Sequence, residues 1–112
     1  MTLKELKQGL MQRPRYIDYR VATNRIDLFF DYHKLRFDNG VIIIPLRKER
    51  ITARGQDLLY IVNKLALPSN TPVKLEFCHQ RYDFSLDNSK YQDGDLNRLK
   101  ICLDQEELVW QK

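Results

Sequence analysis

The sequence predicts a single α+β domain over residues 1–112, built from an antiparallel β-sheet of hairpins and meanders with two helices, one N-terminal and one central. Apolar residues recur at helical spacing in two short segments and alternate with polar residues in most of the others. A chain of 112 residues, 43% hydrophobic and 30% charged, has the size and composition of one folded domain and leaves no room for two.

The first segment predicts a helix that begins after Thr2. Thr2 and Glu5 have the spacing of a capping box, in which hydroxyl and carboxylate each bind a backbone amide at the start of a helix. Three leucines then share one helical face: Leu3, Leu6 and Leu10. Pro14 prevents the helix from continuing.

Alternating residues predict a strand over 15–22. One face carries Ile17, Tyr19 and Val21, and the other carries Tyr16, Asp18 and Arg20. A second strand is expected over 26–32, where the residues are too uniformly apolar to assign one buried face.

Asn39-Gly40 predicts a β-hairpin, because both central residues of a type I′ turn need positive φ. The turn would place two pairs on one face, Phe37 opposite Ile42 and Leu35 opposite Ile44. Pro45 in the returning strand favours an edge position or the end of a strand.

The second half predicts a helix over 56–66, followed by strands at 73–77 and 81–86 that are either two strands or one bent strand. A polar loop over 87–95, a strand over 99–103 and a short last strand over 107–111 complete the chain. The order of helix, strands, helix, strands suggests a duplicated unit, although no repeat is visible in the residues themselves.

Positive charge is concentrated in the first half of the chain. Residues 1–54 contain 12 Lys and Arg against 6 Asp and Glu, whereas residues 55–112 contain 7 against 9. Such asymmetry can form a basic face that attracts polyanions, unless folding mixes the two halves over the surface.

The connection before the second helix is the strongest candidate site. It contains four cations and one acid, Glu49; the cations are Arg47, Lys48, Arg50 and Arg54. The helix N-terminus beside it would offer free amides to a phosphate, and arginine offers forked donors. Arg15, Tyr16 and Arg20 would extend this surface, with Tyr16 and Arg20 on one strand face. The competing interpretation is an ordinary charged, solvated loop.

Nothing in the sequence indicates an enzyme, a cofactor or a metal site. The four glycines stand apart, so no phosphate-binding loop is present. Cys78 and His79 are adjacent, and neighbours on a strand point to opposite faces. We expect both cysteines to be reduced thiols of a cytoplasmic protein. No apolar run approaches the roughly 20 residues of a membrane helix, so we expect no membrane segment.

Three hypotheses for function remain open, of which the third is an enzyme with scattered catalytic residues that no motif reveals. The first is a small basic accessory protein that contacts nucleic acid or a nucleoprotein complex through the Arg and Lys residues above. The second is a protein-binding adaptor or inhibitor that acts through a sheet edge or a surface patch, with a mobile element as one source of such a protein. Trp110 is the candidate protein contact, because tryptophan is enriched at protein interfaces.

Overall fold

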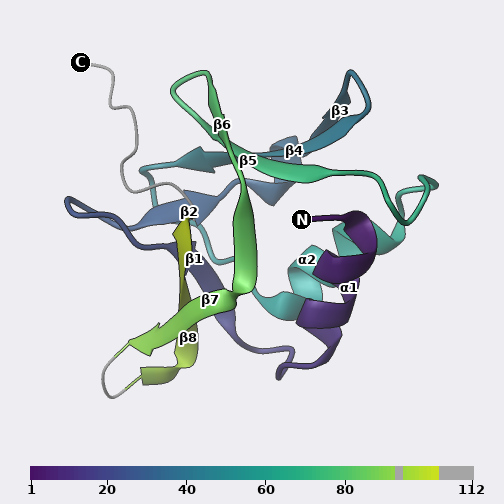
Figure 1. The fold of residues 1–112 in the computed structure, drawn as a ribbon. Coiled ribbons are helices and arrows are strands. Elements are labelled where there is room, and N and C mark those ends of the chain that lie inside the picture. The colour runs from purple at the N-terminus through teal and green to yellow at the C-terminus, as the bar shows by residue number, and fades with distance from the viewer. Residues whose placement is uncertain (93–94, 104–112) are drawn as a thin grey trace.

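The computed structural model describes residues 1–92 and 95–103, with their side chains except those of residues 87–92, 95–97 and 102. Eleven elements are found there (Figure 1): α1 (Leu3–Met11), β1 (Asp18–Val21), β2 (Leu28–Phe30), the 3₁₀ helix η1 (Tyr32–Lys34), β3 (Arg36–Asp38), β4 (Val41–Arg47), α2 (Gly55–Asn63), β5 (Val73–Phe77), β6 (Gln80–Tyr82), β7 (Phe84–Gln92) and β8 (Asp95–Leu103). The strand predicted over 107–111, with Trp110, lies outside the described residues. No helix in the described part is long and apolar enough to cross a membrane.

The α+β class is confirmed, but the sheet is mixed rather than purely antiparallel. Its strands follow the order β6-β5-β4-β2-β1-β8-β7, and β3 pairs with β4 beside this path. Two neighbouring pairs, β4 with β5 and β1 with β8, are parallel. The first parallel pair exists because α2 connects the end of β4 to the start of β5. The helix returns the chain to the end of the sheet at which β4 began, so both strands run in the same direction. Alternation of apolar residues does not specify strand direction, so this feature was not visible in the sequence.

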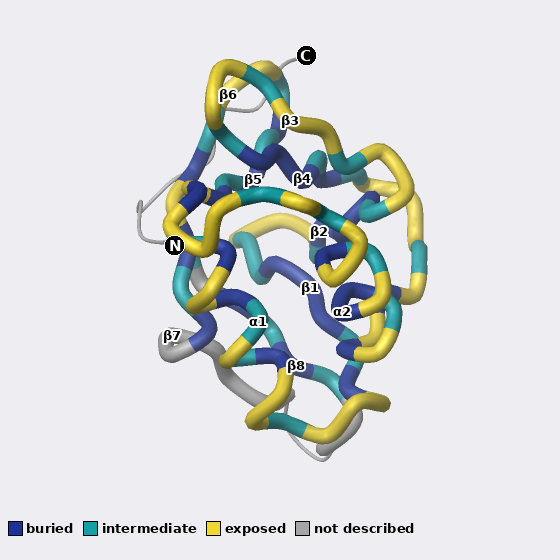
Figure 2. Tube along the Cα trace, turned by 90° about the vertical axis from the view of Figure 1, so that its right-hand side faces the viewer, coloured by how far each residue is buried: buried dark blue, intermediate teal, exposed yellow. Residues whose placement is uncertain are grey.

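The path of strands returns to its own beginning. β6 and β7, at its two ends, are separated only by Asp83 and are the two halves of one bent strand. One half pairs with β5 and the other with β8. The strands therefore form a closed ring, in which exposed residues lie mainly at the turns and on the outer sides of the helices (Figure 2).

The two halves of the chain have the same topology. Each contains one helix followed by strands that pair antiparallel with one another. The last strand of each half pairs in parallel with the first strand of the other, as β4 with β5 and β8 with β1. This arrangement agrees with the duplicated unit that the order of elements suggests.

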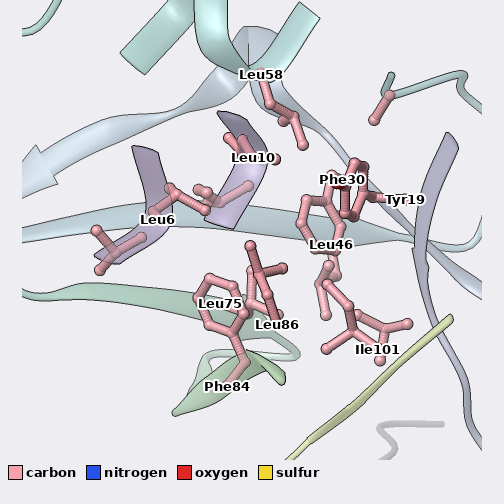
Figure 3. Close-up of a cluster of buried hydrophobic side chains, with 14 of the residues drawn as sticks. Leu6, Leu10, Tyr19, Phe30, Leu46, Leu58, Leu75, Phe84, Leu86 and Ile101 are labelled. Carbon is pink, nitrogen blue, oxygen red and sulfur yellow. The ribbon is translucent and has the colours of Figure 1, made fainter. Parts of the chain in front are cut away.

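The core lies between the helices and the inner faces of the strands (Figure 3). α1 begins with the predicted capping box, in which the Glu5 amide donates to Thr2 Oγ1 at 3.2 Å and the Thr2 amide donates to Glu5 Oε1 at 3.0 Å. The helices contribute Leu3, Leu6, Leu10, Leu58, Leu59 and Val62. Each of the strands β1, β2, β4 and β5 contributes alternate residues, for example Tyr19 with Val21 and Ile42 with Ile44. Periodicity therefore identified the buried faces of α1 and β1, whereas no face had been assigned in the segment that contains β2.

The Asn-Gly hairpin is confirmed, with one of its two predicted pairs. Asn39 has φ 49° and Gly40 has φ 81°, and Phe37 lies opposite Ile42. Leu35 does not pair with Ile44, because η1 ends there and β3 begins only at Arg36. The strand that runs beside β4 is thus interrupted by η1, with β2 before the break and β3 after it.

The edge position predicted from Pro45 is wrong, because β4 lies in the middle of the sheet with β5 on one side and β2 and β3 on the other. The Asp31 amide donates to the Pro45 carbonyl at 2.8 Å. A residue in a strand directs its nitrogen and its carbonyl toward the same neighbour. The ring nitrogen of Pro45, which has no hydrogen to donate, therefore faces the break between β2 and β3, where the ladder is already interrupted.

Several other boundaries differ from the prediction, including those of α2, β2 and β8, and the alternative left open for 73–77 and 81–86 is resolved. β1 begins at Asp18, because residues 15 and 17 use their carbonyls to bind the start of α2. β7 extends to Gln92, so most of the predicted loop over 87–95 is strand. β5 and β6 are two strands joined by a tight turn at Cys78 and His79, whose φ values are 51° and 63°.

Candidate polyanion-binding surface

Two segments that are distant in sequence lie side by side at the start of α2. The Gln56 amide donates to the Arg15 carbonyl, the Gly55 amide to the Ile17 carbonyl and the Tyr19 amide to the Ala53 carbonyl, each at 2.9 Å. The segments are close enough that a Cβ at residue 55 would be in van der Waals contact with the Arg15 oxygen, at 3.4 Å. The chain around Arg15 is therefore held against the end of the basic connection.

Asp18 joins the same two segments through its side chain. Its Oδ1 accepts a hydrogen bond from the Ala53 amide at 3.1 Å, and its Oδ2 accepts one from Arg20 at 2.8 Å. Asp18 also pairs with Arg54 in an isolated β-bridge. The basic connection is thus fixed to β1 by main-chain and side-chain bonds.

Arg47 holds the basic connection in shape from within. Its Nε donates to the Glu49 carbonyl at 3.1 Å and its NH2 donates to the Arg50 carbonyl at 3.3 Å. Its guanidinium also lies 3.9 Å from the buried carboxylate of Asp31. With these donors engaged, Arg47 organises the loop and contributes less charge to the surface than was expected.

Arg20 is not a surface residue, contrary to the sequence-based prediction. It is 5% exposed, bonded to Asp18, 3.7 Å from an oxygen of Asp27, and stacked 5.1 Å from the centre of the Phe29 ring. Tyr16 is 57% exposed, but it precedes β1 and lies in a turn. Arg20 and Tyr16 therefore do not form the shared strand face predicted for them.

Most amides at the N-terminus of α2 are already engaged, contrary to the free amides that the sequence suggested. The amides of Gly55 and Gln56 donate to carbonyls of residues 17 and 15, and the Leu58 amide donates to the Arg54 carbonyl within the helix. The Arg54 amide donates to Asp57 Oδ2 at 3.1 Å, so a carboxylate already occupies the positive end of the helix. Any phosphate at this surface would be bound by side chains.

The remaining predicted cations are exposed on the two segments that these main-chain bonds join. We define the cationic surface as the exposed residues Arg15, Tyr16, Lys48, Arg50 and Arg54. Among the residues that the structure describes, no carboxylate lies within ion-pair distance of Arg15, Arg50 or Arg54. Tyr32 of η1 lies near the start of the same helix. Burial raises the pKa of Tyr32, and the charge of Asp57 raises it further, whereas the charge of Arg54 lowers it.

A recess of about 270 Å³ adjoins this surface, between the end of α1 and the outer side of α2. It is lined by Met11, Arg15, Gln56, Leu59, Tyr60 and Asn63. Met11 is 66% exposed and Tyr60 is 63% exposed. The recess could have been predicted from the sequence, because Gln56, Tyr60 and Asn63 have helical spacing on the side of α2 opposite its apolar face.

The hairpin of β3 and β4 presents a different kind of surface. Phe37 is 54% exposed although its partner Ile42 is fully buried. Beside it, Arg36 binds both carboxylate oxygens of Glu76, and Arg81 binds Asp38. These ion pairs connect β3 to β5 and β6 and were not foreseen from the sequence. Trp110, predicted as a protein contact, lies outside the described residues.

Comparison of the chain with models of protein families, with curated proteins and with solved structures finds no match.

Proposed function

We propose that this protein is a non-catalytic accessory protein that binds nucleic acid, alone or within a nucleoprotein complex, through the cationic surface. The observation that carries the proposal is the set of main-chain bonds between residues 15–19 and 53–56, which brings Arg15 to the basic connection. These bonds support treating the two runs of positive charge as one surface. Phosphates attract such a surface irrespective of base sequence, because positive side chains replace condensed counterions.

The arrangement supports side-chain contacts to phosphate. Arginine presents forked donors that match two phosphate oxygens, and Arg15, Arg50 and Arg54 have no described carboxylate competing for them. Arg47 supports the loop, and Arg20 and Asp18 attach it to β1. The contacting residues and the supporting residues are thus different, and mutations can separate them.

The test is a triple variant in which Lys48, Arg50 and Arg54 become Ala while Arg47 is kept, because Arg47→Ala would also disturb the loop. Binding to labelled DNA and RNA is measured over a salt series. We expect weaker binding and a slope of log affinity against log salt that is smaller by about 2–3, since each lost phosphate contact removes about 0.7–0.9.

The matched control changes three other cations to Ala: Lys4, Lys7 and Lys34. Both triples lower the net charge equally, so a surface-specific effect appears only in the first. Equal slopes for the two triples would contradict the assignment of the cationic surface. If the unaltered protein binds no nucleic acid at low salt, the proposal is wrong, and the exposed Phe37 of the hairpin becomes the place to look for a protein partner instead.

A further inference from the structure

The recess beside the cationic surface combines three kinds of chemistry. Met11, Leu59 and the ring of Tyr60 give it apolar walls. Gln56 and Asn63 supply amides, each of which can donate and accept hydrogen bonds. Arg15 supplies a guanidinium, and none of the lining residues is acidic.

This combination matches a nucleobase. A base has a flat π face that stacks on aromatic side chains and an edge that presents both donors and acceptors. Asn and Gln side chains pair with such edges through two hydrogen bonds. The volume of about 270 Å³ lies below the roughly 300 Å³ at which typical small-molecule pockets begin, so the recess suits one base better than a whole cofactor.

The recess is continuous with the cationic surface. Arg15 belongs to both, and its carbonyl accepts the hydrogen bond of the Gln56 amide at 2.9 Å. Lys64 lies 4.0 Å from the centre of the Tyr60 ring, which steadies the ring and adds another positive charge near the recess. A strand with a phosphate at Arg15 would have a neighbouring base within reach of Tyr60, because both residues line the recess.

We infer that the nucleic acid is single-stranded, with one unstacked base held in the recess against Tyr60 while its neighbouring phosphates contact the cationic surface. This inference rests on the proposed function. A duplex cannot use the recess, because its bases are already stacked and paired, so it would be left with the phosphate contacts alone.

The experiment compares three labelled probes of equal length by fluorescence anisotropy: an oligothymidine strand, a strand with abasic sites in place of bases, and a duplex. The unaltered protein should bind the oligothymidine strand most tightly. Tyr60→Ala should weaken that binding by about 5- to 150-fold, which corresponds to the roughly 1–3 kcal/mol of one stacked base. It should leave the abasic strand and the salt slope unchanged.

Tyr60→Phe is the matched control, because it keeps the stacking ring and removes only the hydroxyl. Tyr60 is mostly exposed, so both variants should fold, and circular dichroism checks this. If all three probes bind equally and Tyr60→Ala changes nothing, the base-binding recess is wrong while the phosphate contacts stand. If no probe binds at low salt, the proposed function fails, and this inference fails with it.

Discussion

The Arg20 guanidinium lies on the outer face of β1, covered by two carboxylates and one aromatic ring. Asp18 accepts its hydrogen bond at 2.8 Å, Asp27 lies 3.7 Å away, and Phe29 stacks on it at 5.1 Å. Asp18 in turn accepts the Ala53 amide at the end of the basic connection. Arg20 therefore supports the segments that carry the cationic surface and is not one of its exposed residues.

Arg20→Met should lower the free energy of unfolding by about 3 kcal/mol, because the substitution leaves two partly buried carboxylates without their shared cation. Lys100, 3.2 Å from Asp27, compensates only one of them. Urea unfolding measures the change, and Arg25→Met on the exposed turn after β1 is the control. An unchanged unfolding free energy would show that Arg20 is not part of the supporting structure.

Among the secondary-structure elements, α1 shows how the stability of a helix depends on its first turn. Thr2 and Glu5 form a reciprocal capping box at its start, and three leucines hold one face against the core. Hydrogen bonding from the Thr2 side chain, and next from the Thr2 backbone, holds the pKa of Glu5 below its ordinary value. A carboxylate with a lowered pKa stabilises the folded state above its unfolded pKa, and this contribution is lost as pH falls through the folded pKa.

Thr2→Ala should therefore raise the Glu5 pKa toward its ordinary value and destabilise the protein by about 1 kcal/mol at neutral pH. The difference between the variant and the unaltered protein should shrink at acidic pH, where Glu5 is protonated in both. NMR titration of the Glu5 carboxyl and urea unfolding at both pH values measure these effects. A Glu5 pKa that is the same in both proteins would rule out the Thr2 hydroxyl as its main cause.

The whole molecule is held together by contacts between its two similar halves. The parallel pairs β4 with β5 and β1 with β8 both join one half to the other, and α1 contacts α2. The bonds between residues 15–19 and 53–56 cross between the first segments of the two halves as well. Each half alone would leave two strand edges unpaired and one side of its helix uncovered.

Fragments 1–50 and 51–112 should consequently be unfolded when separate and should form the native structure when mixed, since both parallel strand pairs and the contact between the helices lie between them. Circular dichroism and NMR spectra of each fragment and of the mixture test this, with the intact chain as the reference. A cooperative unfolding transition in either fragment alone would contradict it, because that half would then have a core of its own.

Local chemistry determined the parts of this protein that depend on a few neighbouring residues. The capping box at Thr2, the turn at Asn39-Gly40 and the alternating faces of β5 follow from hydrogen-bonding groups, backbone freedom and side-chain period, all of which are written in adjacent positions. The exposed cations at Lys48, Arg50 and Arg54 were predicted for the same reason, since a polar connection places its charges outside.

Tertiary structure alone decided which distant segments meet. The parallel pairing of β1 with β8, the closure of the strand ring and the engaged amides of α2 depend on contacts between residues far apart in the chain. For the same reason Arg20 is buried between Asp18 and Asp27, and Arg15 lies beside the basic connection and lines the Tyr60 recess. A sequence records which groups need partners, but only the packed fold determines which partners they find and which groups remain available to a ligand.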